Sequence, residues 1–271
     1  MTSVYLDNRG WLKVTGGDAP RFLQDMLTND VLALTNGEMR YAALLSPQGK
    51  ILFDFMVLRE NSDFLIDVTR SMIQALAKRF GMYKLRADVA ILDISADFAV
   101  RAGWGEPKPA GGVDDPRMPE MGWRQKVARQ PEGDILPYVA HRIRLCVPEG
   151  GQDFVYGDAF PHEANMDRLH GIDFKKGCYV GQEVVSRVEH RGLARKRVIA
   201  LKFAGKAPAA GADVVANGTV IGTVGSTCPG VCLAMVRLDR LVEAGGTCTA
   251  DGVELAADSA ALPLPNANAN H

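Results

Sequence analysis

The sequence of 271 residues lacks any long hydrophobic segment and any excess of charge of one sign. Its longest apolar runs, such as AALL and ILFDFMVL, are too short or too interrupted to cross a bilayer. The formal net charge is −1, so no overall basic field draws the chain to nucleic acid or to anionic lipid. We therefore expect no membrane partner and no direct nucleic-acid partner.

The sequence also lacks a paired-cysteine pattern. Its five cysteines, an odd number, contain no CxxC pair, which argues against a disulfide framework and against a structural zinc site. The first residues, MTSVYLDNRGWLKV, have no apolar core behind a basic head and are not typical of a secretory signal. Free thiols without such a signal favour a reducing compartment, and we expect a cytoplasmic protein without a metal site of its own.

The common catalytic motifs are missing as well. There is no GxSxG, no Walker A sequence, no HExxH, and no GxGxxG after an expected strand. PQGK at residues 47–50 lacks the spacing and the ending of a phosphate-binding loop, so we interpret it as a hairpin turn. The sequence therefore leaves open whether the protein is an enzyme.

The chain changes character along its length. Helical and strand patterns alternate over 1–194, and short strands punctuated by Gly and Asn turns follow over 195–260. We predict an α+β body over 1–194, a small β-barrel over 195–260 and a disordered tail over 261–271. Within the body, VYLD and WLKVTG around Asn8-Arg9-Gly10 are expected to pair as a hairpin. Further strands are expected at 39–45, 51–59 and 63–68, and helices at 71–83, 137–145 and 182–191.

One short stretch, KKGCYVGQE at residues 175–183, concentrates the candidate chemistry. Cys178 lies just before the helix expected at 182–191, whose free N–H groups carry partial positive charge. Lys175 and Lys176 add cations, and all three features favour the thiolate, the form that attacks electrophiles and binds metal. The alternative is that Cys178 is a small buried apolar residue in a turn. Gly181 is expected to allow a close approach of backbone.

Two other features lie near this stretch. Glu163 is a candidate bidentate acceptor for an amino-heterocycle, although a turn cap or an ion pair with Arg168 would explain it equally. The basic residues between Arg187 and Arg197 are candidates for an anion site or for a tRNA contact, and a solvated charged face is the simpler interpretation.

Together these residues resemble a known family. KKGCYVGQE, followed by Arg191-Gly192, resembles the K-G-C-[FY]-x-G-Q-E signature of the YgfZ family, folate-binding proteins related to the glycine cleavage T-protein (aminomethyltransferase). PHEANMD, DAPRFLQDMLTNDV and AALLSPQGKILFDFMVLR are similar to other segments of that family, so the resemblance covers about residues 10–240. It implies a T-protein-like α+β fold: two interleaved antiparallel α+β domains around a folate cavity, with a C-terminal β-barrel.

The resemblance also implies a function. Members are implicated in making, maintaining or repairing 4Fe-4S enzymes, including a tRNA-modifying one, so tetrahydrofolate is the implied cofactor and iron–sulfur client or assembly proteins are the implied partners. Cys178 matches the functional thiol, which could also be a cluster ligand shared with a partner, and Glu163 matches the carboxylate that holds the pterin. The implied folate residues further include Asp54, Tyr179, Gln182 and Arg187, and the rest of the motif is Lys176, Gly177, Gly181, Glu183, Arg191 and Gly192.

The sequence departs from the T-protein at one informative position. Where the T-protein strand carries adjacent aspartates, this chain has Phe53-Asp54. Loss of the first carboxylate, together with the presence of Cys178, points away from aminomethyl transfer. A folate-dependent aminomethyltransferase or demethylase of the T-protein type stays the alternative, because Asp54 is retained. The client protein, the folate form and the oligomeric state are open.

Overall fold

The computed structural model describes residues 2–129, 133–191 and 194–258. The chain forms two compact units, each built from segments that are not contiguous in sequence. The first unit contains residues 1–138, 156–161 and 166–187, and the second contains residues 139–155, 162–165 and 188–271. The interleaving means that neighbouring parts of the 160–190 region belong to different units. The predicted tail over 261–271 lies outside the described residues.

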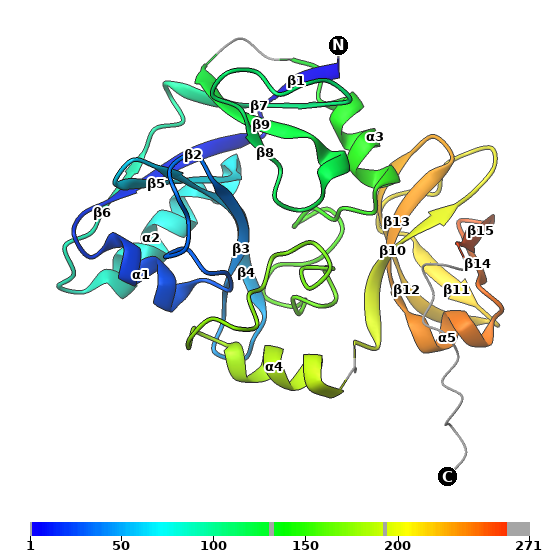
Figure 1. Ribbon diagram of the computed structural model, residues 1–271. Helices are drawn as coiled ribbons and strands as arrows, with labels where there is room; N and C mark the ends of the chain where they lie inside the picture. Colours follow the sequence, from blue (N-terminus) through cyan, green and yellow to red (C-terminus); the bar gives the residue numbers. More distant parts are fainter. Residues whose placement is uncertain (1, 130–132, 192–193, 259–271) are drawn as a thin grey trace. The chain divides into compact units, whose positions relative to one another are not determined.

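The first unit is built on a five-stranded sheet with the strand order β3-β4-β5-β2-β6 (Figure 1). All of its neighbouring strands are antiparallel. Its strands are β2 (Arg9–Thr15), β3 (Met39–Leu45), β4 (Ile51–Glu60), β5 (Asp63–Thr69) and β6 (Ala90–Asp93). The strands predicted at 39–45, 51–59 and 63–68, and the hairpin turn at PQGK, are thus confirmed.

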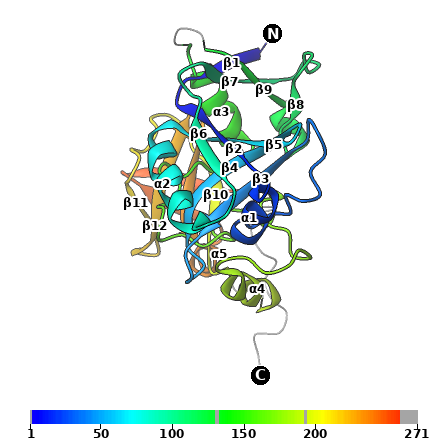
Figure 2. The ribbon, with the colours of Figure 1, turned by 90° about the vertical axis from the view of Figure 1, so that its left-hand side faces the viewer.

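The two faces of this sheet differ in chemistry because side chains alternate along each strand. One face is covered by α1 (Ala19–Met26) and α2 (Ile73–Lys84), as Figure 2 shows. Its core is apolar and includes Leu44, Phe55 and Ile66 from the strands, with Leu23 and Phe80 from the helices. The residues between them, including Asp54 and Asp67, point to the other face, which therefore carries buried polar groups.

A second sheet of the first unit has the order β1-β7-β9-β8. Its strands are β1 (Thr2–Leu6), β7 (Phe98–Trp104), β8 (Val113–Asp114) and β9 (Trp123–Ala128). The predicted hairpin of β1 with β2 is wrong, because β1 pairs with β7 instead. Both edges of β2 are taken by β5 and β6, so β2 has no edge left for β1. The turn at Asn8 carries the chain from one sheet to the other.

The second unit contains a closed barrel with the strand order β10-β13-β12-β11-β14-β15. Its interior is filled by side chains such as Leu201, Val214, Val236 and Leu255. The helix α5 (Leu238–Glu243) follows β13. The strands are β10 (Lys196–Lys202), β11 (Asp213–Ala216), β12 (Thr219–Cys228), β13 (Val231–Arg237), β14 (Thr247–Ala250) and β15 (Val253–Ala257). The predicted C-terminal β-barrel is confirmed.

Two further helices complete the chain, α3 (Leu136–Arg144) and α4 (Gln182–Arg191). Both match helices expected from the apolar spacing, to within one residue at each end. Short 3-10 turns lie at Arg70–Met72 and Pro119–Met121. No helix within the described ranges is long and apolar enough to cross a membrane.

Candidate functional site

The stretch that carries Cys178 is an irregular segment that leads into α4. Its cysteine is exposed and its tyrosine, Tyr179, is buried. Gly181 has φ +83°, and a Cβ there would lie 2.6 Å from the carbonyl oxygen of Ser46, so only glycine fits this close approach. Gly49, in the same β3–β4 turn, faces Val184 of α4, because a Cβ there would lie 2.9 Å from the Cβ of Val184. The start of α4 is thus packed on the SPQGK turn.

Lys176 anchors the other end of the segment. Its side chain is buried, and its ammonium donates hydrogen bonds to the carbonyl oxygens of Gln24 (2.7 Å), Leu27 (2.5 Å) and Asn29 (3.0 Å). Burial lowers the pKa of Lys176 to about 8, against the nearby carboxylates, which raise it. The ammonium form therefore still predominates at pH 7. Lys175 is exposed, so the two adjacent lysines have different environments.

Cys178 differs from the other four cysteines. All five are free thiols, and only Cys178 is exposed, whereas Cys146 is half-buried and the three barrel cysteines are buried. Burial raises the pKa of Cys232 to about 12 and that of Cys248 to about 11, which keeps both protonated at neutral pH. A reagent or a partner protein can therefore reach Cys178 before the others.

The remaining residues of the motif lie on or beside α4. Gln182 is half-buried at its first position, and Glu183 and Arg187 are exposed on its surface. Gly177 is exposed, with nothing within 4 Å of the position its Cβ would take. Arg191 ends α4, and its side chain and Gly192 lie outside the described residues.

Asp54 lies in β4 on the polar face of the five-stranded sheet and is 7% exposed. Its two carboxylate oxygens accept hydrogen bonds from the hydroxyls of Tyr41 (3.0 Å) and Tyr156 (2.5 Å). Burial, and then the charge of Asp54, raises the pKa of both tyrosines well above the ordinary value. Both phenols therefore stay protonated donors, and Asp54 is a partnered acceptor rather than a free acid.

A larger buried network of charges lies on the same side of this sheet. Asp67 accepts from Arg9 (2.6 Å) and from Arg124, and Asp115 accepts from Arg117 (2.7 Å) and from Arg124 (3.0 Å). Burial alone would raise the pKa of Asp115, but Arg117 and Arg124 outweigh it and hold that pKa well below its usual value. The network joins β2 and β5 of one sheet to β9 of the other.

The tyrosines and arginines of these networks were not predicted as site residues. Tyr138 adds its hydroxyl, which accepts from Arg117 (2.9 Å) and Arg124 (2.7 Å), and the ring of Tyr41 lies 6.0 Å from the guanidinium carbon of Arg117. One signal was available in the sequence. A carboxylate inside an apolar strand, as in ILFDFMV and DFLIDVT, indicates a buried charge that must have partners. Which partners it has depends on residues far away in the chain.

Glu163 belongs to the second unit, whereas Asp54 and Cys178 belong to the first. The Glu163 side chain is half-buried, and its backbone carbonyl accepts from the N–H of Val198 in β10 (2.8 Å). Two residues on, Asn165 donates to the carbonyl of Val198 (2.9 Å) and accepts from Arg197 (3.1 Å). The PHEAN segment is thus fixed to the first strand of the barrel, which orders the backbone at Glu163.

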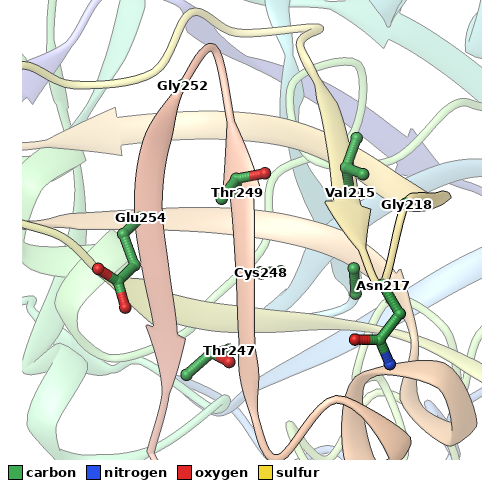
Figure 3. Close-up of a pocket in the computed structure, with 9 residues that line it drawn as sticks. Val215, Asn217, Gly218, Thr247, Cys248, Thr249, Gly252 and Glu254 are labelled. Atoms are coloured by element: carbon green, nitrogen blue, oxygen red, sulfur yellow. The ribbon is translucent and has the colours of Figure 1, made fainter.

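The barrel also carries an open groove of about 420 Å³ where β11 and β14 meet (Figure 3). These strands pair only at Val215 and Thr249, so they diverge on either side of that point. Asn217, Thr247 and Glu254 line the groove with polar groups. None of its lining residues belongs to the motif or was predicted from the sequence as a site residue.

Both the first sheet region and the C-terminal barrel of this chain match known protein domains. Residues 6–107 match the GCVT N-terminal domain, and residues 195–262 match the CAF17 C-terminal β-barrel domain. The glycine cleavage system aminomethyltransferase T of Bartonella henselae is similar in structure, with a TM-score of 0.75 and 18% identity over 95% of this chain and 84% of that one. The predicted T-protein-like fold with a β-barrel is therefore confirmed.

The sequence relatives decide the family. The mitochondrial iron–sulfur cluster assembly factor IBA57 of Homo sapiens is 33% identical in an alignment that covers 82% of this chain and 71% of that protein. The chain belongs to the IBA57 family. The IBA57 homologue of Mycosarcoma maydis is 35% identical over 72% of this chain, and that of Neurospora crassa is 34% identical over 77%. The chain spans only 56% and 55% of the length of these two fungal proteins.

This membership bears on two expectations. The predicted resemblance is confirmed for an iron–sulfur cluster assembly family with a T-protein-like fold; the relatives named above are IBA57 proteins, and the YgfZ member of the family is not shown. The expected cytoplasmic location is contradicted, because these IBA57 relatives are described as mitochondrial. Free thiols indicate a reducing compartment, and that property does not distinguish the cytoplasm from other reducing compartments.

Proposed function

We propose that this protein is an accessory factor in the assembly, maintenance or repair of iron–sulfur enzymes, tRNA-modifying ones included, and that it acts through the thiol of Cys178. The observation that carries the proposal is the contrast among five free cysteines, of which Cys178 is the exposed one. It lies between a buried lysine anchor and a glycine that leaves no room for a Cβ against the β3–β4 turn. The names of the IBA57 relatives support the iron–sulfur part of the proposal. Client proteins or assembly proteins are the partners it implies.

The proposal is tested in cells that lack the gene for this protein. The wild-type chain and Cys178→Ser are expressed at equal levels, and the specific activity of a 4Fe-4S enzyme is measured. We expect the wild type to restore activity and Cys178→Ser to fail. Cys146→Ser is the matched control, because Cys146 is a half-buried free thiol outside the motif. Full restoration by Cys178→Ser would remove the thiol from the function.

We further propose that tetrahydrofolate is the bound cofactor, as a carrier of one-carbon units. Glu163 fits such a group as a half-buried carboxylate on ordered backbone, because the pterin presents paired N–H donors to a bidentate acceptor. Asp54 fits less well as a direct contact, since each of its oxygens already accepts from a tyrosine. Tyr179, Gln182 and Arg187 stay proposed contacts.

Calorimetry with tetrahydrofolate tests this part separately. Loss of a charged hydrogen bond in Glu163→Gln should weaken binding by about 1.5–3 kcal/mol, roughly 10- to 150-fold in Kd. Glu183→Gln, on the exposed surface of α4, serves as the control and should bind like the wild type. Equal affinity of all three proteins would exclude Glu163 from the site, and no heat of binding to any of them would exclude the cofactor.

The alternative, a folate-dependent aminomethyltransferase or demethylase, receives less support from the geometry. Its candidate acid or base is Asp54, whose oxygens are both engaged by tyrosine hydroxyls. The adjacent position carries Phe53, which is buried and cannot exchange a proton. Turnover of an aminomethyl or N-methyl substrate with tetrahydrofolate by the purified protein would favour this alternative over the accessory role.

A further inference from the structure

Lys176 lies two residues before Cys178, but its buried ammonium is directed at backbone carbonyls. A lysine ammonium has three N–H donors and no acceptor. All three directions are accounted for by the carbonyl oxygens of Gln24, Leu27 and Asn29, at 2.5–3.0 Å. No donor of Lys176 is left over for a thiolate. The charge of this lysine is therefore directed at backbone carbonyls.

These carbonyls belong to the end of α1 and to the loop that follows it. The last carbonyls of a helix have no partner within the helix and carry partial negative charge. Gln24 lies in the last turn of α1 and Leu27 is its C-cap residue. Lys176 thus caps α1 from a position about 150 residues later in the chain, with sequence separations of 152 and 149.

Lys176 is one of several bonds that hold the same two segments together. The N–H of Asp173 donates to the carbonyl of Thr28 (3.0 Å), and the hydroxyl of Thr28 donates to the carbonyl of Gly171 (2.7 Å). The side-chain amide of Asn29 donates to the carbonyl of His170 (2.7 Å). The carboxylate of Asp173 also accepts from the N–H groups of Lys175 (2.7 Å) and Lys176 (3.1 Å). Residues 170–176 are therefore fixed along residues 24–29.

The next fixed point after Lys176 is Gly181, which lies so close to the β3–β4 turn that an added Cβ would be 2.6 Å from the carbonyl oxygen of Ser46. Between these two points lies the exposed thiol of Cys178, followed by the buried ring of Tyr179. The ammonium of Lys176 lies 5.2 Å from the centre of that ring, a cation–π contact that further orders the segment.

We propose that Lys176 is the positioning residue of Cys178: it fastens residues 173–179 to the end of α1 and so holds the thiol exposed beside the start of α4. The inference deepens the proposed function, because it concerns the same thiol. It assigns different roles to the two lysines of the motif. Lys175, which is exposed, contributes only its charge, whereas Lys176 contributes geometry.

The test compares Lys176→Met with Lys175→Met in the purified protein. Each variant loses one positive charge beside Cys178 and gains a similar unbranched side chain. The two variants differ only in the clamp, by which we mean the three hydrogen bonds from the Lys176 ammonium to the carbonyls of Gln24, Leu27 and Asn29. Amide hydrogen exchange is followed over residues 173–181, and the rate of alkylation of Cys178 by iodoacetamide is followed by peptide mass spectrometry at neutral pH. Peptide mapping separates Cys178 from the other four cysteines.

We expect Lys176→Met to speed amide exchange over this segment by about tenfold or more, because a local hydrogen-bonded unit opens. Its rate of Cys178 alkylation at neutral pH should fall about threefold, as the thiol is no longer held in one exposed position. Lys175→Met should keep the wild-type exchange rates, and any change in its alkylation rate should vanish in 1 M salt. Equal behaviour of the two variants in exchange and in alkylation rate would overturn the assignment.

A measurement on the wild-type protein covers the case in which Lys176→Met does not fold. An amine-selective imidoester should modify Lys175 at least about tenfold faster than Lys176 in the native protein, since buried amines react slowly. Equal modification would likewise overturn the clamp. Lys176→Arg keeps charge and donors and should restore most of the exchange protection. None of these readouts depends on cluster assembly, so failure of the clamp and failure of the iron–sulfur role are separable.

Discussion

Replacement of Arg124 by methionine is the sharpest test of the buried charge network. Arg124 is 1% exposed and bonds Asp67, Asp115 and the hydroxyl of Tyr138. Arg9 also bonds Asp67 and Arg117 also bonds Asp115, so Arg124 is the cation that the two carboxylates share. Arg124→Met takes one charged partner from each of these two buried carboxylates. Removing one partner of a buried ion pair typically costs about 3–5 kcal/mol of the free energy of unfolding.

A control on the same strand separates burial from pairing. Lys126, two residues further along β9, makes an ion pair with Glu60 at 2.6 Å, but their side chains are 20% and 37% exposed. A pair of that kind contributes about 0–1 kcal/mol. Lys126→Met should therefore cost no more than about 1 kcal/mol, although it removes an equally short ion pair.

Urea unfolding followed by tryptophan fluorescence is the assay. The three tryptophans, Trp11, Trp104 and Trp123, all belong to the first unit, so the signal reports the unit that contains the network. A cost for Arg124→Met below about 1 kcal/mol, or equal to that of Lys126→Met, would refute the reasoning.

Three further predictions follow from single contacts. Gly181→Ala should lower the free energy of unfolding by about 1–3 kcal/mol, since φ is +83° and the added Cβ would lie 2.6 Å from the Ser46 carbonyl oxygen. Gly177→Ala is the control: nothing lies within 4 Å of the added Cβ, so its urea midpoint should stay close to that of the wild type. The folded-state pKa of Lys176, about 8, lies below its ordinary value of 10.5, so the unfolded chain binds more protons between these values. The contribution of this group to the free energy of unfolding must then rise with pH from about 8 to 10.5. The difference in free energy of unfolding between the wild type and Lys176→Met, measured by urea unfolding across that window, should follow this rise. A difference that does not depend on pH would contradict the burial of the ammonium. Burial, and then the charge of Asp54, raises the pKa of Tyr41 and of Tyr156, and Asp54→Asn removes the second of these causes. An ultraviolet titration should therefore show the two phenols ionising at lower pH than in the wild type, and an unchanged curve would contradict the contribution of Asp54.

Local elements of the fold were predictable because their signals lie within a few residues. The turn at PQGK and the strands on either side of it follow from glycine and from apolar runs, and β3 and β4 confirm them. The helix after Gly181 follows from the spacing of Val184, Val185 and Val188, and α4 confirms it. The pairing of β1 was predicted wrongly, since a short turn such as that at Asn8 serves a hairpin and a passage between sheets equally well.

The candidate site was predictable in part. The motif fixes which residues surround Cys178 in sequence, and the exposure of that thiol agrees with a functional role. The partners of Asp54 could not be predicted, because Tyr156 lies 102 residues away along the chain. The same holds for Arg124 and Asp67, which are 57 residues apart and belong to different sheets.

The sequence by itself determined that the segment 175–183 leads into a helix and that Gly181 allows a close approach of backbone, because backbone preferences and apolar spacing act over a few residues. It also showed that the thiol stands between two lysines and a helix start. Only the tertiary structure decided what those lysines do. One ammonium is buried against the carbonyls at the end of α1 and the other stays in solvent, a difference that arises from packing between residues about 150 positions apart.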